Sequence, residues 1–299
     1  MSLEQRFSGH ESFVCRYGWL SKVYRAVSTQ QNVLKDDLES MGTLGIGRNM
    51  VKSIQFWGEA TGVIEPNGEG GHQPGPVGLK LMSAGGWDPY LESLESLWLI
   101  HWWLASYADM AAWNEVFAED GVKQFDRKGL IDRLTLRASE KPRPLASSTL
   151  EQHASIFLQS YLKEERSNDD TSWCPLQDLG LLTFKAGEDG KTNFQVANRN
   201  PQGLTLRVFA VCVLNYVRHN GLNAKSIALS ELVQGVRSPG RILCLDELLI
   251  RRMIDDLAAG LLQGCLRFND TADTQSIVVT LPNAPEELLL VADYEALNA

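Results

Sequence analysis

Apolar residues in the first part of the chain recur at helical spacing and are separated by short polar breaks. Within residues 20–27 they stand at positions i, i+3, i+4 and i+7, which is typical of an amphipathic helix; they are Leu20, Val23, Tyr24 and Val27. The apolar positions of residues 34–41 predict a second, shorter helix that ends at Gly42. The turn 42–45 is short enough to set the following helix at a steep angle, as in a helix-turn-helix.

The third helix is predicted within residues 44–65, and its two faces differ in chemistry. One face is apolar or small and is expected to point inward; it carries Val51, Ile54, Gly58 and Thr61. The opposite face carries polar side chains at spacings of four, three and four, namely Arg48, Lys52, Gln55 and Glu59. Recognition helices present such side chains to a DNA groove, so the candidate DNA-binding residues of this helix are Arg48, Asn49, Lys52 and Gln55.

The residues after this helix are patterned like the wing of a winged helix. Gly62 is a natural helix stop, a polar turn follows over 66–75, and 77–81 alternates like a returning strand that carries Lys80. We therefore predict an N-terminal winged helix-turn-helix DNA-binding domain over residues 1–86, with Lys80 as a further DNA contact. The alternative is a helical bundle that binds protein, because many winged helices do so.

The central region, residues 87–165, is predicted to be a helical domain with a structural role. Asp88 and Pro89 provide a cap and an N1 proline for a long apolar helix. Residues 148–151 match a capping box for another helix that runs to about Lys163. Helical patterns also occur around residues 110–118 and 129–138, and the polar segment 166–172 predicts a linker; the region between wing and linker is expected to be all-helical.

The last region, residues 173–299, repeats the N-terminal pattern in outline. One helix is predicted over 206–217, a second opens at Ser230, and Asp246 caps a third. Two short alternating runs around a polar turn then predict a hairpin, which gives a second, winged-helix-like domain. The chain as a whole is therefore predicted to be mainly α (α+β), with an N-terminal winged helix-turn-helix, a central helical region and a second, C-terminal winged helix.

Charge is distributed unevenly along the chain. The 28 basic and 37 acidic side chains give a net charge of −9, whereas a protein that holds DNA by bulk neutralisation is usually basic. Residues 199–252, however, contain eight basic and three acidic side chains. A local basic face on an acidic body favours selective, salt-sensitive contact with DNA. Its candidate DNA-binding residues are Arg237, Arg241 and Arg251, although a solvated basic face is the alternative for any one of them.

Composition narrows the setting in which the chain acts. The most apolar stretch, 94–112, is interrupted by charged residues, so no membrane span is expected. Five scattered cysteines without a Cys-x-x-Cys pair argue against zinc ribbons and disulfide scaffolds, and a reducing cytoplasm is the simplest location. Trp98, Trp102 and Trp103 offer more apolar surface than one helix needs for its own core, and we expect a homodimer.

The segment 6–19, before the first predicted helix, is dense in reactive side chains. Hydrolysis of a phosphodiester needs a base, positive charge at the phosphoryl oxygens and a positioned water. His10 could act as the base, Glu11 as a metal ligand or base, and Arg16 as a phosphate clamp, which makes these three the candidate catalytic residues. The alternative is that His10 and Glu11 only fasten the N-terminus to the first domain.

Recognised motifs for other chemistry are absent from the sequence. It contains no His-Glu-x-x-His, no phosphate-binding Gly-x-x-x-x-Gly-Lys loop and no dinucleotide fingerprint, so no organic cofactor is expected. A divalent metal ion, magnesium or manganese, is expected, but its ligands are unknown. The acidic pairs 36–37 and 255–256 could bind magnesium, yet such pairs on helices are more often solvated surface.

Three segments together resemble one bacterial family: FSGHESFVCRYGWLSKVYRAV, GIGRNMVKSIQFWGEATGVIE and SPGRILCLDELLIRRMIDDL. This SspB-like family, formerly a domain of unknown function, is encoded beside phosphorothioate DNA-modification genes, and the resemblance covers nearly the whole chain. It implies a DNA nickase that works with a cysteine desulfurase, an ATP-using sulfur-transfer protein and an ATPase. The nick would open one strand of double-stranded DNA so that sulfur can replace a phosphate oxygen, in support of phage defence.

Three hypotheses for function follow from the residues and the resemblance. The first is a metal-dependent DNA nicking endonuclease that serves phosphorothioate modification. The second is a non-catalytic DNA-binding specificity subunit of the same system, and the third is a transcriptional regulator that uses the same helix. The resemblance assigns no catalytic residues, so His10, Glu11 and Arg16 rest on the local sequence alone.

Overall fold

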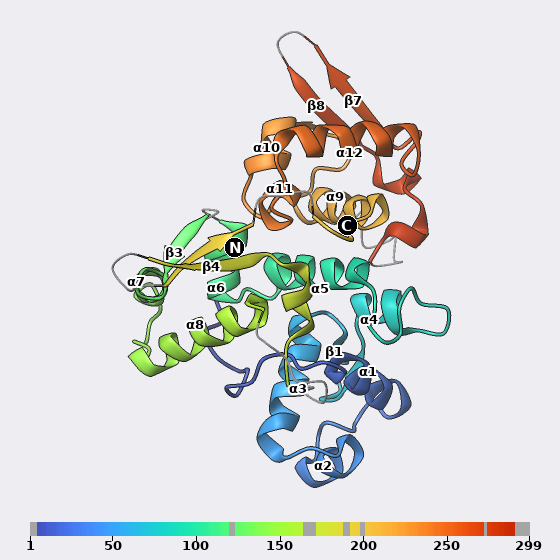
Figure 1. Ribbon diagram of the computed structural model, residues 1–299. Coiled ribbons are helices and arrows are strands. Elements are labelled where there is room, and N and C mark those ends of the chain that lie inside the picture. Colours follow the sequence, from blue (N-terminus) through green and yellow to red (C-terminus); the bar gives the residue numbers. More distant parts are fainter. Residues whose placement is uncertain are drawn as a thin grey trace.

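Helix α5 (Leu94–Tyr107) crosses the middle of the molecule, and the rest of the chain packs around it (Figure 1). The computed structural model describes residues 5–119, 123–163, 172–187, 192–197, 201–271 and 274–290. Within these residues the fold is a mixed α+β arrangement of helices with three small antiparallel sheets. Trp98 and Trp102 of α5 are at most 1% exposed, so this helix forms the centre of the core.

The N-terminal unit consists of three helices and a hairpin (Figure 1). Its elements are α1 (Trp19–Thr29), α2 (Asp37–Leu44), α3 (Arg48–Ala60), β1 (Ile64–Pro66) and β2 (His72–Pro74). Asp36 caps α2 by accepting the Glu39 N–H at 2.9 Å, and Gly45, at φ 63°, ends it. Helix α3 packs against α1 and α2 and buries Val51 and Ile54, as the apolar pattern predicted.

The predicted wing strand over residues 77–81 is wrong, because these residues form helix α4 (Pro76–Met82). Gly75 precedes a proline at the first helical position, where the fixed φ of proline and its missing N–H favour a helix. Val77 and Leu81 then lie one helical turn apart and are both buried. The strand that returns to β1 is β2, which pairs with it from Ile64 opposite Pro74.

Helix α5 is followed by α6 (Ala111–Trp113), the π-helical turn η1 (Asn114–Ala118), α7 (Arg127–Ala138) and α8 (Ser147–Tyr161). Two predicted caps differ from the structure. Ser93 caps α5, whereas Asp88 accepts the N–H groups of Glu92 and Ser93 in the preceding loop. Helix α8 begins after Ala146 without a side-chain cap, so the capping box is not formed.

The central region is not all-helical, because it contributes a strand to a three-stranded sheet. Strand β3 (Gln124–Asp126) and strand β4 (Leu182–Ala186) both pair antiparallel with β5 (Thr192–Val196), in the order β3-β5-β4. The short helix η2 (Pro175–Leu179) precedes β4 and packs on α8. Most of the predicted linker 166–172 lies outside the described residues.

The C-terminal unit lies on the other side of α5 from α1–α3, with its β7–β8 hairpin projecting from the molecule (Figure 1). Its helices are α9 (Leu206–His219), α10 (Leu229–Gln234), α11 (Pro239–Ile242) and α12 (Glu247–Ala259). Its strands β6 (Ser226–Ala228), β7 (Leu266–Asp270) and β8 (Gln275–Val279) form a sheet in the order β6-β8-β7. Two short turns, η3 (Leu281–Asn283) and η4 (Glu286–Leu288), follow.

Buried polar groups join the helices around α5. His101 lies at 2.8 Å from the carbonyl oxygen of Ile242 and at 2.7 Å from the Tyr161 hydroxyl, which also accepts the indole N–H of Trp113. Burial lowers the pKa of His101 to about 4, so its imidazole is neutral at pH 7. Nε2–H then donates to Ile242 and Nδ1 accepts from Tyr161. These hydrogen bonds fasten α5 to α8 and α11.

The tryptophan surface expected for a homodimer is not on the outside of the molecule. Trp98 and Trp102 fill the chain's own core, and Trp103 is half-buried. A homodimer therefore stays a prediction without that surface to support it. No helix in the described ranges is long and apolar enough to cross a membrane.

Candidate nucleic-acid interface

The first five residues of α3 include three exposed polar side chains, Arg48, Asn49 and Lys52. Gly45 and Gly47 lie in the turn before it, and no side chain caps the helix start. Arg48 Nε lies 3.1 Å from Asp37 Oδ2, but both side chains are about half exposed, so this ion pair is weak and easily exchanged. These three predicted residues lie together on one accessible surface.

Gln55, predicted on the same face, has a different environment. It is half-buried, and its amide donates to Glu59 Oε1 at 3.0 Å. Glu59 also contacts His72 Nε2 at 2.8 Å, which ties α3 to strand β2. Burial raises the pKa of Glu59, but the hydrogen bonds from His72 and Gln55 outweigh it and leave that pKa below its usual value. Gln55 and Glu59 therefore join α3 to the hairpin.

Lys80 lies on helix α4 instead of a wing strand, away from the first turn of α3. Its Nζ donates to the carbonyl oxygen of Glu287 at 2.8 Å and lies 5.6 Å from the centre of the Trp87 ring. Burial lowers the pKa of Lys80, although Glu286 and Glu287 oppose that change. The side chain connects α4 with the C-terminal turn η4.

The three C-terminal arginines predicted to bind DNA all have partners within the chain. Arg237 pairs with Asp109 at 2.6 Å and donates to the carbonyl oxygen of Ser106 at 2.8 Å. Arg241 donates to the carbonyl oxygens of Gln234 and Glu119. Arg251 forms an ion pair with Asp270 of β7, and 40% of its side chain is exposed. Each guanidinium is thus already engaged within the chain.

His10 lies inside the protein, not on a surface open to substrate. It is 1% exposed, its carbonyl oxygen accepts the Ser53 hydroxyl at 2.9 Å, and its ring stacks on His153 of α8 with centroids 5.5 Å apart. Phe56 meets the ring edge-on. His153 was not identified from the sequence; the only signal for it is a polar residue on an otherwise apolar face of α8.

The contacts of the two imidazoles determine their tautomers. The Ala112 N–H donates to His153 Nε2 at 3.2 Å, so neutral His153 carries its proton on Nδ1, which lies 3.3 Å from His10 Nε2. His10 then carries its own proton on Nδ1, a buried atom without a hydrogen-bond partner among the described residues. Burial lowers the pKa of His10 to about 4 and that of His153 to about 3, so both are neutral at pH 7.

Glu11 and Arg16 do not converge on the His10 ring in the way a catalytic group would. Glu11 is exposed, and both Glu11 (φ 49°) and Ser12 (φ 64°) have left-handed backbone conformations, which turn the chain sharply after His10. The Arg16 guanidinium lies over the rings of Phe13 and Trp19, at 5.1 and 5.5 Å. These contacts therefore support a structural role, in which His10 and its neighbours hold the N-terminal segment in place, more clearly than a phosphodiester-hydrolysing site.

The described residues contain no group of three or more His, Cys, Asp or Glu side chains arranged to hold a metal ion. The acidic pairs considered from the sequence illustrate this. Asp36 caps α2 and Asp37 pairs with Arg48, whereas Asp255 and Asp256 are exposed on α12. The part of the chain that the structure describes therefore contains no preformed divalent metal site.

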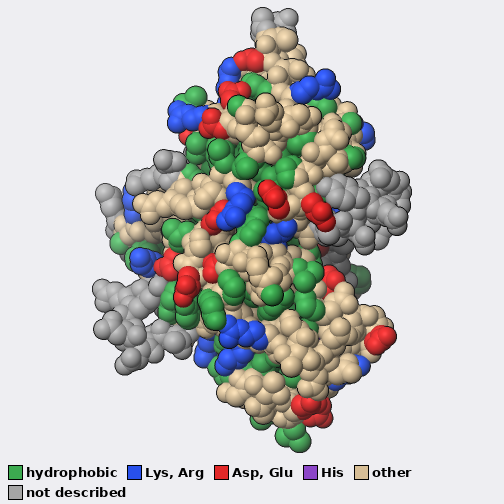
Figure 2. Space-filling view, turned by 90° about the vertical axis from the view of Figure 1, so that its right-hand side faces the viewer, with side chains coloured by type: hydrophobic (Ala, Val, Ile, Leu, Met, Phe, Trp, Pro, Cys, Tyr) green, Lys and Arg blue, Asp and Glu red, His purple; other side chains and the backbone are tan. Residues whose placement is uncertain are grey.

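One side of the molecular surface carries mixed charge (Figure 2). Figure 2 shows basic and acidic side chains interspersed over one face of the molecule, with hydrophobic side chains between them. A pocket of about 540 Å³ lies beside α1, and the sequence analysis did not identify it. The signal that could have indicated it is the basic pair Lys22 and Arg25, three residues apart on the exposed face of α1.

Comparisons with known proteins point to one family. Two solved structures, a magnesium-ion-bound SspB crystal structure and an SspB crystal structure, are similar to the chain with a TM-score of 0.81 and 25% sequence identity. The similarity covers 93% of this chain and 86% and 84% of those chains, so the protein is SspB-like over nearly its whole length. No curated protein matched the sequence. The sequence model of the family described as "Protein of unknown function (DUF4007)" matches residues 7–294, and the chain therefore belongs to that family.

Proposed function

We propose that the chain is a DNA-nicking subunit of a phosphorothioate-modification system and binds duplex DNA through the start of α3. The observation that carries the proposal is the likeness to SspB across 93% of the chain. The family resemblance seen in the sequence connects SspB-like proteins with single-strand phosphorothioation. The exposed group Arg48, Asn49 and Lys52 supports the DNA contact, because an arginine and a lysine beside an amide suit both phosphates and base edges.

We propose further that both ends of the chain are winged helix-turn-helix units. In the N-terminal unit the short turn with Gly45 at φ 63° joins α2 to α3, and a hairpin follows α3. In the C-terminal unit α12 is followed by the β7–β8 hairpin, which β6 extends to a sheet. With α3 as recognition helix, its N-terminal residues would contact base edges in the major groove.

A divalent-metal requirement belongs to the proposal because one of the similar SspB structures is bound to magnesium. No ligand is assigned, since the described residues do not form a metal-holding group. Partner proteins are proposed from the family resemblance alone: a cysteine desulfurase, an ATP-using sulfur-transfer protein and an ATPase. A nick made by this chain would open one strand for their sulfur-transfer chemistry.

The second candidate function is a non-catalytic subunit that positions the sulfur-transfer proteins on DNA. One observation favours it: His10 is buried and neutral, whereas Glu11 is exposed. In this function Arg48 and Lys52 bind DNA, and the strand break is made by another component.

Incubation with supercoiled plasmid separates the two functions. The purified chain, with magnesium or manganese, should convert the plasmid to the open-circular form, and a chelator should stop the conversion. A gel shift of the same plasmid without any nicking would support the non-catalytic subunit. The Arg48→Ala/Lys52→Ala variant is the control, because it should lose both nicking and the shift while its thermal unfolding stays that of the wild type.

A further inference from the structure

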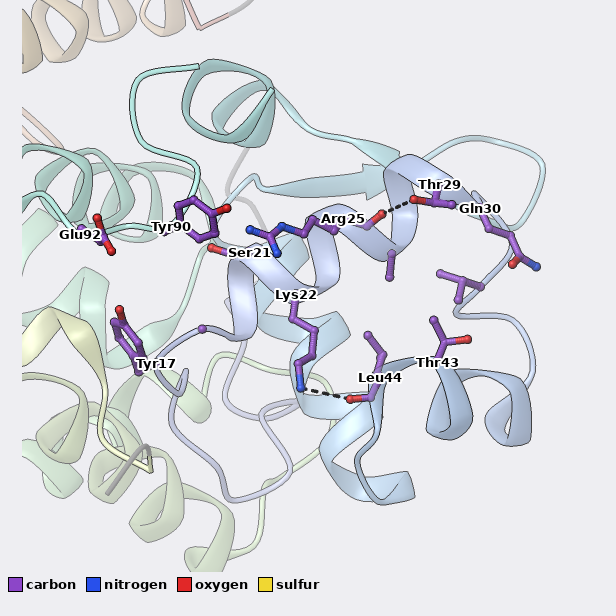
Figure 3. Close-up of a pocket in the computed structure, with 13 residues that line it drawn as sticks. Tyr17, Ser21, Lys22, Arg25, Thr29, Gln30, Thr43, Leu44, Tyr90 and Glu92 are labelled. Carbon is purple, nitrogen blue, oxygen red and sulfur yellow. Dashed lines mark hydrogen bonds between the residues drawn. The ribbon is translucent and has the colours of Figure 1, made fainter. Parts of the chain in front are cut away.

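The pocket beside α1 has the size and shape of a binding site. Its volume of about 540 Å³ is within the range of roughly 300–1,000 Å³ that is typical of small-molecule sites. Figure 3 shows that α1 forms its centre, that Thr43 and Leu44 at the end of α2 close one side, and that Tyr17, Tyr90 and Glu92 lie on the other. Because α1 packs on both α2 and α3, the pocket belongs to the same unit as Arg48 and Lys52.

Two aromatic rings at the pocket are exposed and held in place. Tyr17 is 39% exposed; its ring stacks on Trp173 at 5.3 Å and 19°, and its N–H donates to the Trp173 carbonyl oxygen. Tyr90 is 56% exposed, and the Arg25 guanidinium lies 4.7 Å from its ring centre. An exposed ring held in position is a platform on which a nucleobase can stack, whatever its identity.

The same pocket provides positive charge and hydrogen-bonding groups. Lys22 and Arg25 line it from α1, and the only acidic side chain among the lining residues is Glu92. Lys22 Nζ donates to the carbonyl oxygen of Leu44 at 3.2 Å, which holds the ammonium at the pocket wall. Ser21 also lines the pocket, but it is only 7% exposed, and its Oγ is buried without a hydrogen-bond partner within the described chain.

We propose that this pocket binds one nucleotide of a DNA strand whose base is unpaired. The base stacks on Tyr17 or Tyr90, and its phosphate is held by Lys22 and Arg25. This inference rests on the proposed function, because a strand that is opened beside a nick exposes unpaired nucleotides. A free mononucleotide has the same chemistry, so the experiment must distinguish the two sources.

The test is fluorescence anisotropy with a labelled 12-nucleotide single strand and, separately, a blunt duplex of the same sequence. Either Tyr90→Ala or Tyr17→Ala, whichever removes the ring that carries the base, should weaken single-strand binding roughly tenfold, which is the effect expected for losing one base–aromatic stack. Tyr90→Phe should retain binding, because the ring remains. Phe184→Ala is the matched control, since Phe184 is also an exposed ring, at 59%, but lies on strand β4 away from the pocket.

Duplex binding is read separately to distinguish this inference from the proposed function. Loss of single-strand binding in Tyr90→Ala or Tyr17→Ala, with duplex binding unchanged, supports the pocket. The same loss in a protein that binds no duplex supports the pocket and overturns the duplex contact through α3. Wild-type single-strand binding in both tyrosine variants overturns the pocket assignment. If thymidine 5′-monophosphate displaces the oligonucleotide as effectively as unlabelled oligonucleotide does, the assignment to a DNA strand is also overturned, in favour of a free nucleotide.

Discussion

His153 donates its Nδ1 proton to His10 Nε2 across 3.3 Å, and this contact joins the N-terminal segment to helix α8. The direction of the hydrogen bond follows from the Ala112 N–H, which occupies the other nitrogen of His153. His10, which the sequence suggested as a catalytic base, is thus one of two neutral, hydrogen-bonded imidazoles. The consequence is a contact that is stable only while both rings remain unprotonated.

This contact predicts a loss of stability in mild acid. The folded-state pKa values of His10 and His153, about 4 and about 3, lie below the ordinary value of 6.5. Stability from these groups is therefore fully present above pH 6.5 and is lost as the pH falls towards 4, because the unfolded chain binds protons that the folded chain excludes. The loss is on the order of 3 kcal/mol for His10 alone. Urea unfolding between pH 8 and pH 4.5 measures it.

The His10→Asn/His153→Asn variant provides the comparison for that experiment. It removes both titrating groups, so the free energy of unfolding should depend less steeply on pH than in the wild type. Identical pH profiles for the two proteins would contradict the prediction. His101 remains in the variant and, with its pKa also lowered to about 4 by burial, should leave a residual dependence of the same sign.

Catalysis by the N-terminal segment can be tested against fastening with two single changes. His10→Ala should lower the free energy of unfolding by about 2–3 kcal/mol, because it removes a packed ring and leaves the His153 donor without a partner. Glu11→Gln should leave stability unchanged, since Glu11 is exposed. Abolished nicking in both variants with unchanged melting temperatures would instead assign these residues to the chemistry.

Binding of DNA by α3 predicts distinct effects for two neighbouring residues. Arg48→Ala should cost roughly 1–3 kcal/mol and relax selectivity at one base pair, if Arg48 contacts a base. Lys52→Ala should weaken binding to all sequences and lower the salt slope by about 1, as expected for one phosphate contact. Titrations at several salt concentrations measure both effects. Lys128→Ala, a change of an exposed residue on α7, is the control. Wild-type DNA binding by the Arg48→Ala/Lys52→Ala variant would exclude α3 as the recognition helix.

The ion pair of Arg237 and Asp109 predicts a structural role for an arginine that the sequence suggested for DNA. Their side chains are only 19% and 11% exposed, and Arg237 also donates to Ser106. Arg237→Ala should lower the free energy of unfolding by about 3 kcal/mol, because it leaves a mostly buried carboxylate unpaired. Adding Asp109→Asn should recover part of that loss. Arg48→Ala breaks an exposed pair and should cost less than about 1 kcal/mol by the same denaturation assay.

Gly62 lies close against the Trp103 ring of α5, and replacing this glycine gives a prediction with a matched control. Gly62 has φ +67°, and a Cβ there would lie 2.4 Å from the Trp103 ring of α5. Gly68 has φ +75° but nothing within 4 Å of the same position. Gly68→Ala should cost about 1 kcal/mol from backbone strain alone. Gly62→Ala should cost about 1–3 kcal/mol more, from overpacking; equal costs in thermal unfolding would show that Trp103 moves aside freely.

Local patterns predicted the elements whose partners lie close in sequence. The stripe from Leu20 to Val27 and the two-sided pattern of α3 correspond to buried and exposed faces in the structure. Asp246 caps α12 by accepting the Leu249 N–H, and the hairpin that follows it forms as expected. In these cases one helical turn or one tight turn determines the structure, so the sequence carries the information locally.

The features that the sequence did not predict depend mostly on residues that lie far apart in the chain. Strand β3 is only three residues long, and it pairs with β5, with Gln124 opposite Gln195. No local sequence pattern identifies a pairing between strands so far apart in the chain. The alternation of residues 77–81 also fits a helix with buried residues four apart, and Pro76 decides between the two. The pocket beside α1 combines Tyr17, Lys22 and Tyr90 from segments that only the fold brings together.

The central helix sets a fixed distance between the two ends of the molecule. Helix α5 has 14 residues, so it is about 21 Å long. It packs on α3 of the N-terminal unit and on α9 and α11 of the C-terminal unit, which fixes the separation of the two units. Inserting one base pair between two contacted DNA segments displaces them by about 3.4 Å and rotates them by about 35°. A chain that grips DNA at both ends would therefore tolerate one spacing between its two contact points and reject its neighbours.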